Sequence, residues 1–211
     1  MAPRPVQTAH LPFGNRRSMF FTLLEHPNIQ RVKAVGLRGG GITLLHMATQ
    51  QPQGVEAMVP ISAPPYFPAQ VRAIQRQYST SIISETEMTR IGERHKGGER
   101  QIEWIIAQTR AMARSCDDVN FTPPLLGTIT ARTLIVLGEM DPLYWVRLAF
   151  ELRDAIPRSS LWVVPGSGHG PVFGKNGRIS SPQQSPFGAA TGPKSSSDCS
   201  DHGGHKDRPR S

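Results

Sequence analysis

Cysteine, aromatic residues and long apolar runs are all scarce in this 211-residue chain. Its two cysteines, Cys116 and Cys199, are far apart and form no CxxC pair, which excludes the disulfide framework of a small secreted domain. No stretch reaches the about 18 apolar residues of a membrane span, and the N-terminal segment lacks the apolar run of a signal peptide. These absences predict a cytoplasmic protein with no membrane partner.

The two ends of the chain have the composition of unfolded segments. Residues 175–211 contain 17 Gly, Ser or Pro, and their large apolar side chains are Ile179 and Phe187. Such a segment buries too little apolar surface to offset its chain entropy. We therefore predict a flexible N-terminus over residues 1–15, a folded domain over 16–174 and a disordered tail over 175–211.

The formal net charge of +8 raises nucleic acid as a partner. However, the tail carries +3 of this charge, and the +5 on the rest of the chain is scattered. No basic stripe with interleaved aromatic residues is present. The distribution therefore argues against nucleic-acid binding.

Between the two ends, strand-like and helix-like patterns alternate. Strands that alternate with helices imply right-handed crossovers and a parallel sheet. The predicted fold class is thus α/β, with a parallel sheet of about four strands. The strands are predicted at residues 32–37, 55–62, 132–138 and 160–166, and the helices at 16–26, 40–51, 69–77, from Ser84 onward, at 98–115 and at 143–156.

A long insertion, about residues 66–126, separates the second and third predicted strands. Its apolar periodicity predicts about three helices rather than a linker, and Ser84 with Glu87 has the form of a capping box. An insertion at this point would lie over the carboxyl ends of the strands, where α/β proteins bind their ligands. We expect it to form a helical lid.

Three chemically distinctive residues follow the ends of predicted strands. Arg38 lies in the turn VGLRGGG, Asp141 follows the third strand in LGEMDP, and His169 follows the fourth in PGSGHG. A strand-turn-helix element with glycines on both sides of its central residue has the shape of a nucleophile elbow. A carboxylate and a histidine at neighbouring strand ends are the groups that activate such a nucleophile.

These segments resemble the α/β-hydrolase superfamily of the serine-hydrolase type. VKAVGLRGGGITLLHMA is similar to its elbow, with Arg38 in place of serine. Residues 130–173 are similar to its acid strand, helix and histidine loop, and LIVLGEMDP followed by GH is the most specific part. The resemblance covers residues 17–173 and implies a partial α/β-hydrolase fold, without the upstream half of the sheet and without the last helix.

The resemblance also implies roles for individual residues. Asp141 would orient and polarise His169, His169 would be the general base, and the backbone N–H of Gly39 would supply half of an oxyanion hole. The ancestral activity would be acyl or ester hydrolysis on a small apolar ester or acid, without a metal or cofactor. The loop that donates the other oxyanion N–H belongs to the missing upstream half.

Arg38 cannot be the nucleophile, because its guanidinium stays protonated and has no usable lone pair. Three explanations are open: a genuine loss of the nucleophile, a sequence error at a serine codon, and an arginine repurposed to bind an anion beside a helix N-terminus. Because a triad acts as a unit, the loss of the nucleophile alone predicts negligible hydrolase activity. A sequence error at this position would instead imply an active hydrolase.

Other residues of the same types have plainer explanations. Asp141 could cap a helix that begins at Leu143, a role compatible with orienting a histidine. His46 is expected to be a satisfied core or boundary residue. The tail residues Cys199, His202 and His205 make a weak zinc pattern, because they lie in a low-complexity segment.

Two further hypotheses concern the whole chain. The lid and strand ends could form a non-catalytic binding site for a small apolar carboxylate, held by Arg38. Alternatively, the chain could fail to fold stably, because the strand at residues 32–37 would be an exposed apolar edge and an aggregation site.

Overall fold

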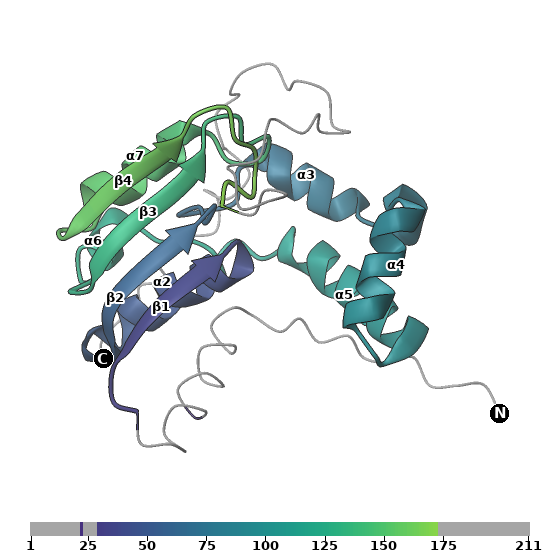
Figure 1. Ribbon diagram of the computed structural model, residues 1–211, viewed down its shortest axis with the longest axis horizontal. Coiled ribbons are helices and arrows are strands. Elements are labelled where there is room, and N and C mark those ends of the chain that lie inside the picture. Colours follow the sequence, from purple (N-terminus) through teal and green to yellow (C-terminus); the bar gives the residue numbers. More distant parts are fainter. Residues whose placement is uncertain (1–21, 23–28, 173–211) are drawn as a thin grey trace, which may run out of the picture.

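A single four-stranded sheet organises the computed structural model, which describes residue 22 and residues 29–172 (Figure 1). The strand order is β1-β2-β3-β4, and all three neighbouring pairs are parallel. The predicted α/β class and parallel sheet are confirmed. The strands are β1 (Val32–Leu37), β2 (Val55–Ile61), β3 (Arg132–Gly138) and β4 (Ser159–Val164).

The helices fall into a group that packs on the sheet and a group that forms the insertion. Helix α2 contacts β1 and β2, and helix α7 contacts β3 and β4. Short 3₁₀ turns at Pro52–Gly54 and Thr80–Ile82 complete the described elements. The helices are α2 (Gly39–Gln50), α3 (Ala69–Gln77), α4 (Glu85–Arg94), α5 (Gly98–Met112), α6 (Pro123–Leu126) and α7 (Val146–Ala155).

The main hydrophobic core lies between the sheet and the helices α2, α6 and α7. Leu45 on α2 and Leu152 on α7 are fully buried in it, together with Ile135 on β3. The helical spacing of Ile42, Leu45 and Ala48 in the sequence therefore corresponds to a face that packs on the sheet. Burial of this face against the strands stabilises α2, because a helix of this length is marginal alone.

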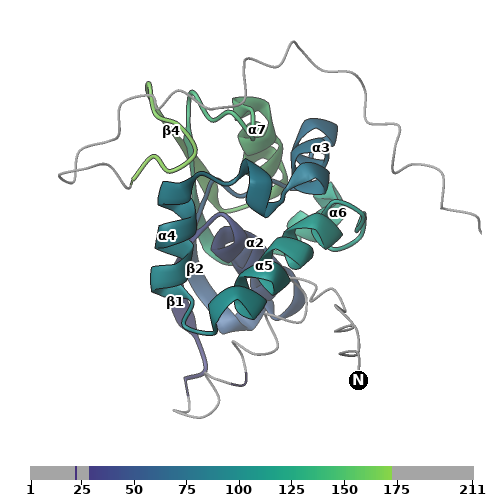
Figure 2. The same ribbon diagram turned by 90° about the vertical axis from the view of Figure 1, so that its right-hand side faces the viewer.

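The insertion helices α3, α4 and α5 lie beyond the carboxyl ends of the strands (Figures 1 and 2). The side-chain oxygen of Ser84 accepts a hydrogen bond from the backbone N–H of Glu87 at 3.3 Å, so Ser84 caps α4 as the sequence indicates. Helix α3 packs against α5. Their position is the one expected for a lid.

Several sequence-based boundaries differ from the observed ones. The helix predicted from residue 143 begins at Val146, and Cys116 lies in a bend after α5 rather than in a helix. Segment 1–15, the tail from 175 and, apart from residue 22, the helix predicted over 16–26 lie outside the described residues, as does Cys199.

Candidate functional site

The turn between β1 and α2 has the backbone strain of an elbow. Arg38 at its centre has φ 54° and ψ −117°, a left-handed conformation that non-glycine residues rarely adopt. The backbone N–H of Arg38 donates to the carbonyl of Ile61 at 2.8 Å, and its carbonyl accepts from Ile42 at 3.0 Å. These bonds hold the turn between the sheet and the first turn of α2, and the Arg38 residue is exposed.

Close backbone approach explains the glycine before this turn. A Cβ on Gly36 would lie 2.5 Å from the carbonyl carbon and oxygen of Gly40. A Cβ on Gly40 would meet nothing within 4 Å. The sharp turn therefore depends on Gly36, and it leads directly into the N-terminus of α2.

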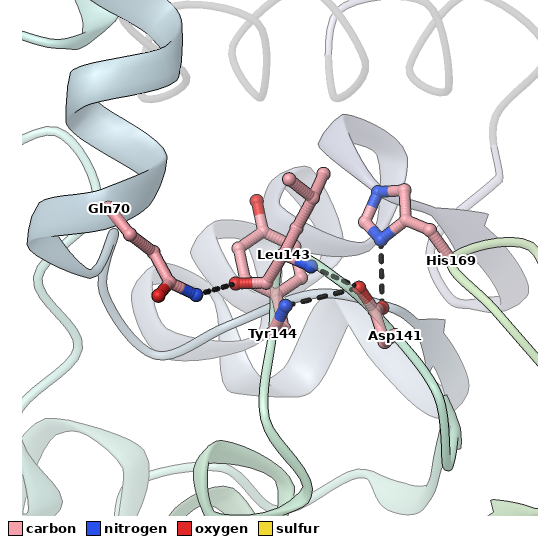
Figure 3. Close-up of polar contacts among 5 residues, drawn as sticks. All are labelled: Gln70, Asp141, Leu143, Tyr144 and His169. Atoms are coloured by element: carbon pink, nitrogen blue, oxygen red, sulfur yellow. Dashed lines mark hydrogen bonds and ion pairs between the residues drawn. The ribbon is translucent and has the colours of Figure 1, made fainter. Parts of the chain in front are cut away.

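Asp141 and His169 are brought together by two loops at the carboxyl ends of β3 and β4. The Asp141 Oδ2 atom lies 2.8 Å from the His169 Nδ1 atom (Figure 3). The two loops are bonded to each other through their backbones, because the N–H of Met140 donates to the carbonyl of Ser167 at 2.8 Å. The acid and the histidine predicted from the sequence therefore form a hydrogen-bonded pair.

The carboxylate of Asp141 is held in place as a hydrogen-bond acceptor. Its side chain is fully buried, and its Oδ1 atom accepts the backbone N–H groups of Leu143 at 2.9 Å and Tyr144 at 3.1 Å. An ionised carboxylate only accepts hydrogen bonds, so the His169 Nδ1–H donates to it. In the neutral imidazole this leaves the Nε2 lone pair as the basic position.

Tyr144 is a part of the site that sequence reasoning missed. Its ring lies 5.3 Å from the His169 ring, tilted by 58°, and the residue is buried. Burial raises the pKa of Tyr144 far above its usual range, the charge of Asp141 adds to this rise, and the charge of Arg38 opposes it. The only signal in the sequence was its position three residues after Asp141.

The positive charge of Arg38 also affects the pKa of Tyr78, on the insertion side of the site. Burial raises the pKa of Tyr78, which directly follows α3; Glu87 adds to this rise, and the charge of Arg38 lowers it. Arg38 is therefore close enough to influence one phenol from the insertion and one from the loop after β3. Within residues 29–172 its guanidinium has no ion-pair partner.

The structure also tests the plainer explanations for His46 and Asp141. The His46 Nε2 atom lies 2.8 Å from the Asp118 carbonyl, and its ring lies 4.7 Å from that of Phe121, so it is a satisfied boundary residue as expected. Asp141 does not cap a helix at Leu143, because the cap position of α7 is Trp145; it closes the turn before that helix instead.

The described part of the chain has neither a cluster of metal ligands nor a helix that could span a membrane. Residue 22 and residues 29–172 contain no group of three or more His, Cys, Asp or Glu that could hold a metal ion. The weak zinc pattern of Cys199, His202 and His205 lies outside these residues. Among the described helices, none has the length and apolar character needed to cross a membrane.

Neither a protein-family model nor a curated protein matches the chain. Solved structures do match. A meta-cleavage product hydrolase from Pseudomonas fluorescens IP01 is 17% identical, with a TM-score of 0.58 over 79% of this chain and 68% of its own. A thermophilic esterase from Thermogutta terrifontis is 16% identical, with a TM-score of 0.53 over 77% of this chain and 67% of its own.

A membrane phospholipase A described as a bacterial virulence factor is 19% identical, with a TM-score of 0.60 over 80% of this chain and 60% of its own. These similarities confirm the α/β-hydrolase fold that the sequence predicts. The chain spans about two thirds of the length of such structures, in agreement with a partial fold.

Proposed function

We propose that this protein, which has the α/β-hydrolase fold over most of its length, derives from an ester or acyl hydrolase and has lost nucleophilic catalysis. The observation that carries the proposal is a strained turn with Arg38 at its centre, at the same edge of the parallel sheet as an intact Asp141–His169 pair. The acid and base remain, and the group that would form an acyl-enzyme is absent. In this proposal the protein is cytoplasmic and acts on, or derives from an enzyme for, small apolar esters.

Covalent labelling tests this proposal directly. A fluorophosphonate probe reacts with an activated serine, so it should label Arg38→Ser and leave the unchanged chain unlabelled. The labelled peptide should contain position 38 and not Ser62, a fully buried serine at the end of β2. In Arg38→Ser combined with His169→Gln the labelling should fall by about 100-fold or more, because the base is removed.

Turnover of short p-nitrophenyl esters gives the second readout. Arg38→Ser should exceed the unchanged chain by about 100-fold or more, because the acid and the base then have a nucleophile to activate. Robust turnover with covalent labelling of the unchanged chain would overturn the proposal. An unreactive but folded Arg38→Ser variant would show that the turn does not present an activated nucleophile to His169.

A second candidate function is the binding of a small apolar carboxylate. The specific observation in its favour is that the exposed Arg38 has no ion-pair partner within residues 29–172 and lies at the turn that leads into the N-terminus of α2. A guanidinium binds a carboxylate through two parallel hydrogen bonds. Octanoate should then raise the melting temperature while octanol does not, and Arg38→Met should abolish the difference. Equal effects of the acid and the alcohol would exclude this candidate.

A further inference from the structure

The Asp141–His169 pair retains a base that has lost its usual partner. The Nδ1 side of the His169 ring is tied to the buried carboxylate, and the other ring nitrogen points away from Asp141 (Figure 3). Within residues 29–172 no hydrogen bond to this Nε2 atom is formed. In a complete hydrolase this nitrogen takes the proton of the nucleophile, so here it is available to another proton donor.

Four contacts keep this base in one orientation. Asp141 is held by two backbone N–H groups, it accepts the third hydrogen bond from His169, and the Tyr144 ring packs against the imidazole. The His169 side chain is 14% exposed, so its ring is largely enclosed while one edge can reach solvent. A fixed imidazole at a partly open position is the arrangement of a general base that activates water.

When water takes the place of the nucleophile, Arg38 can stabilise negative charge on the substrate. Its guanidinium is a permanent cation with five N–H donors, and it follows β1 at the same edge of the sheet as Asp141 and His169. The N–H of Gly39 begins α2 and is one of the helix's unpaired first-turn donors. Both groups are suited to stabilise a developing oxyanion.

We propose that the site promotes slow, direct hydrolysis of activated esters by water, with His169 as the general base and Arg38 as the stabiliser of the oxyanion. This inference rests on the proposed function, because it requires that position 38 supplies no nucleophile. As the water oxygen bonds to the ester carbonyl carbon, a proton moves from the water to Nε2 of His169. The carbonyl π electrons move to the oxygen, which faces the guanidinium.

Collapse of the tetrahedral adduct completes the reaction. The carbonyl re-forms, the bond to the leaving oxygen breaks, and the proton on His169 passes to the leaving alcohol or phenol. Water and ester thus give acid and alcohol, without oxidation or reduction and without a covalent enzyme intermediate. Since this route lacks the acceleration of an acyl-enzyme, the substrate class is esters of weakly basic alcohols, such as phenols.

The test uses the full-length chain and p-nitrophenyl acetate. His169→Gln and Asp141→Asn should each lower the turnover by about 100-fold, the lower end of what a positioned general base contributes. His95→Gln, which removes an imidazole at the end of α4, should leave the turnover unchanged. Arg38→Met should lower it by about tenfold or more, because it removes the positive charge from the oxyanion. Thermal melts verify that each variant is folded. If His169→Gln does not fold, Asp141→Asn provides the test of the general base.

Mechanistic readouts separate this route from nucleophilic catalysis. The reaction should be slower in D₂O, show no burst of p-nitrophenol and leave no acetylated protein in the mass spectrum. Turnover that survives both His169→Gln and Asp141→Asn would overturn the inference and leave the proposed function standing. A burst with an acetyl group on His169 would also overturn it. A burst with an acetyl group on another residue, together with robust turnover, would overturn the proposed function as well.

Discussion

At the residue scale, the glycines around the turn differ in how much room they have for a side chain. Gly36 faces the backbone of Gly40 at a distance that leaves no room for a Cβ, whereas the reverse position is open. The strained conformation of Arg38 lies between them. The glycines are alike in the sequence, but the fold leaves each a different amount of room for a Cβ atom.

This difference predicts opposite effects of the same substitution. Gly36→Ala should lower the free energy of unfolding by about 1–3 kcal/mol or more, because the backbone at Gly40 must move away from the new methyl group. Gly40→Ala should be neutral or raise it by up to about 1 kcal/mol, because alanine stabilises an open helical position. Urea unfolding of both variants measures the contrast, and equal losses would contradict it.

The sequence predicts the site residues that lie in short, distinctive segments. Asp141 and His169 were predicted from LGEMDP and PGSGHG, and the structure places them 2.8 Å apart. Tyr144 was missed because a tyrosine before a helix gives no sign that it will pack against a histidine from another loop. The catalytic roles themselves remain predictions that the variants above test.

At the element scale, Asp141 holds the turn that precedes α7. Its carboxylate accepts the N–H groups of Leu143 and Tyr144, and the helix starts after this turn, at Val146. Apolar periodicity alone extended the helix back to residue 143. Apolar periodicity reports which side chains share a face and carries no information about a side-chain hydrogen bond that holds the preceding turn.

The insertion helices are joined by a buried arginine on α3. Arg72 is 6% exposed, and its guanidinium donates to the carbonyl of Phe67 at 3.1 Å and to that of Ser115 at 2.7 Å. It also lies within 3.4 Å of the carbonyl of Ala113, at the end of α5. This one side chain therefore satisfies carbonyl groups from both ends of the insertion and ties α3 to α5.

Arg72→Met should loosen the insertion selectively. We expect a loss of about 2–3 kcal/mol, because buried carbonyl groups lose a charged donor. Hydrogen exchange should then accelerate in α3 and α5 more than in β3 and α7. Arg76→Met, on the same helix but exposed, should change stability by less than about 0.5 kcal/mol. Uniform acceleration across the sheet would show that the insertion and the sheet open as one unit.

At the scale of the whole molecule, the two faces of the sheet differ. One face is covered by the core with α2, α6 and α7, and the other carries a small cluster of Ile61, Val136 and Val164. Val35 on β1 is 69% exposed, and β1 is an edge strand among the described residues. An apolar edge of this kind favours association between chains.

Val35→Lys should therefore reduce self-association. A charge on the edge strand opposes pairing with another chain, so the monomer should persist to higher protein concentration in sedimentation velocity. Phe150→Lys is the control, because Phe150 is 50% exposed on α7 and lies away from the edge. If Phe150→Lys reduces association as much as Val35→Lys, general surface hydrophobicity and not the edge is responsible.

The sequence by itself determined the α/β class, the parallel order of strands and helices, and the residues that stand at the strand ends. It could do so because apolar periodicity and glycine-rich turns are local, and because the carboxyl ends of parallel strands meet at one edge. Only the tertiary structure decided which loops touch: the pairing of Asp141 with His169 and the packing of the Tyr144 ring against the imidazole. These contacts join residues far apart in the chain, and their distances and burial depend on how the whole sheet and the insertion pack.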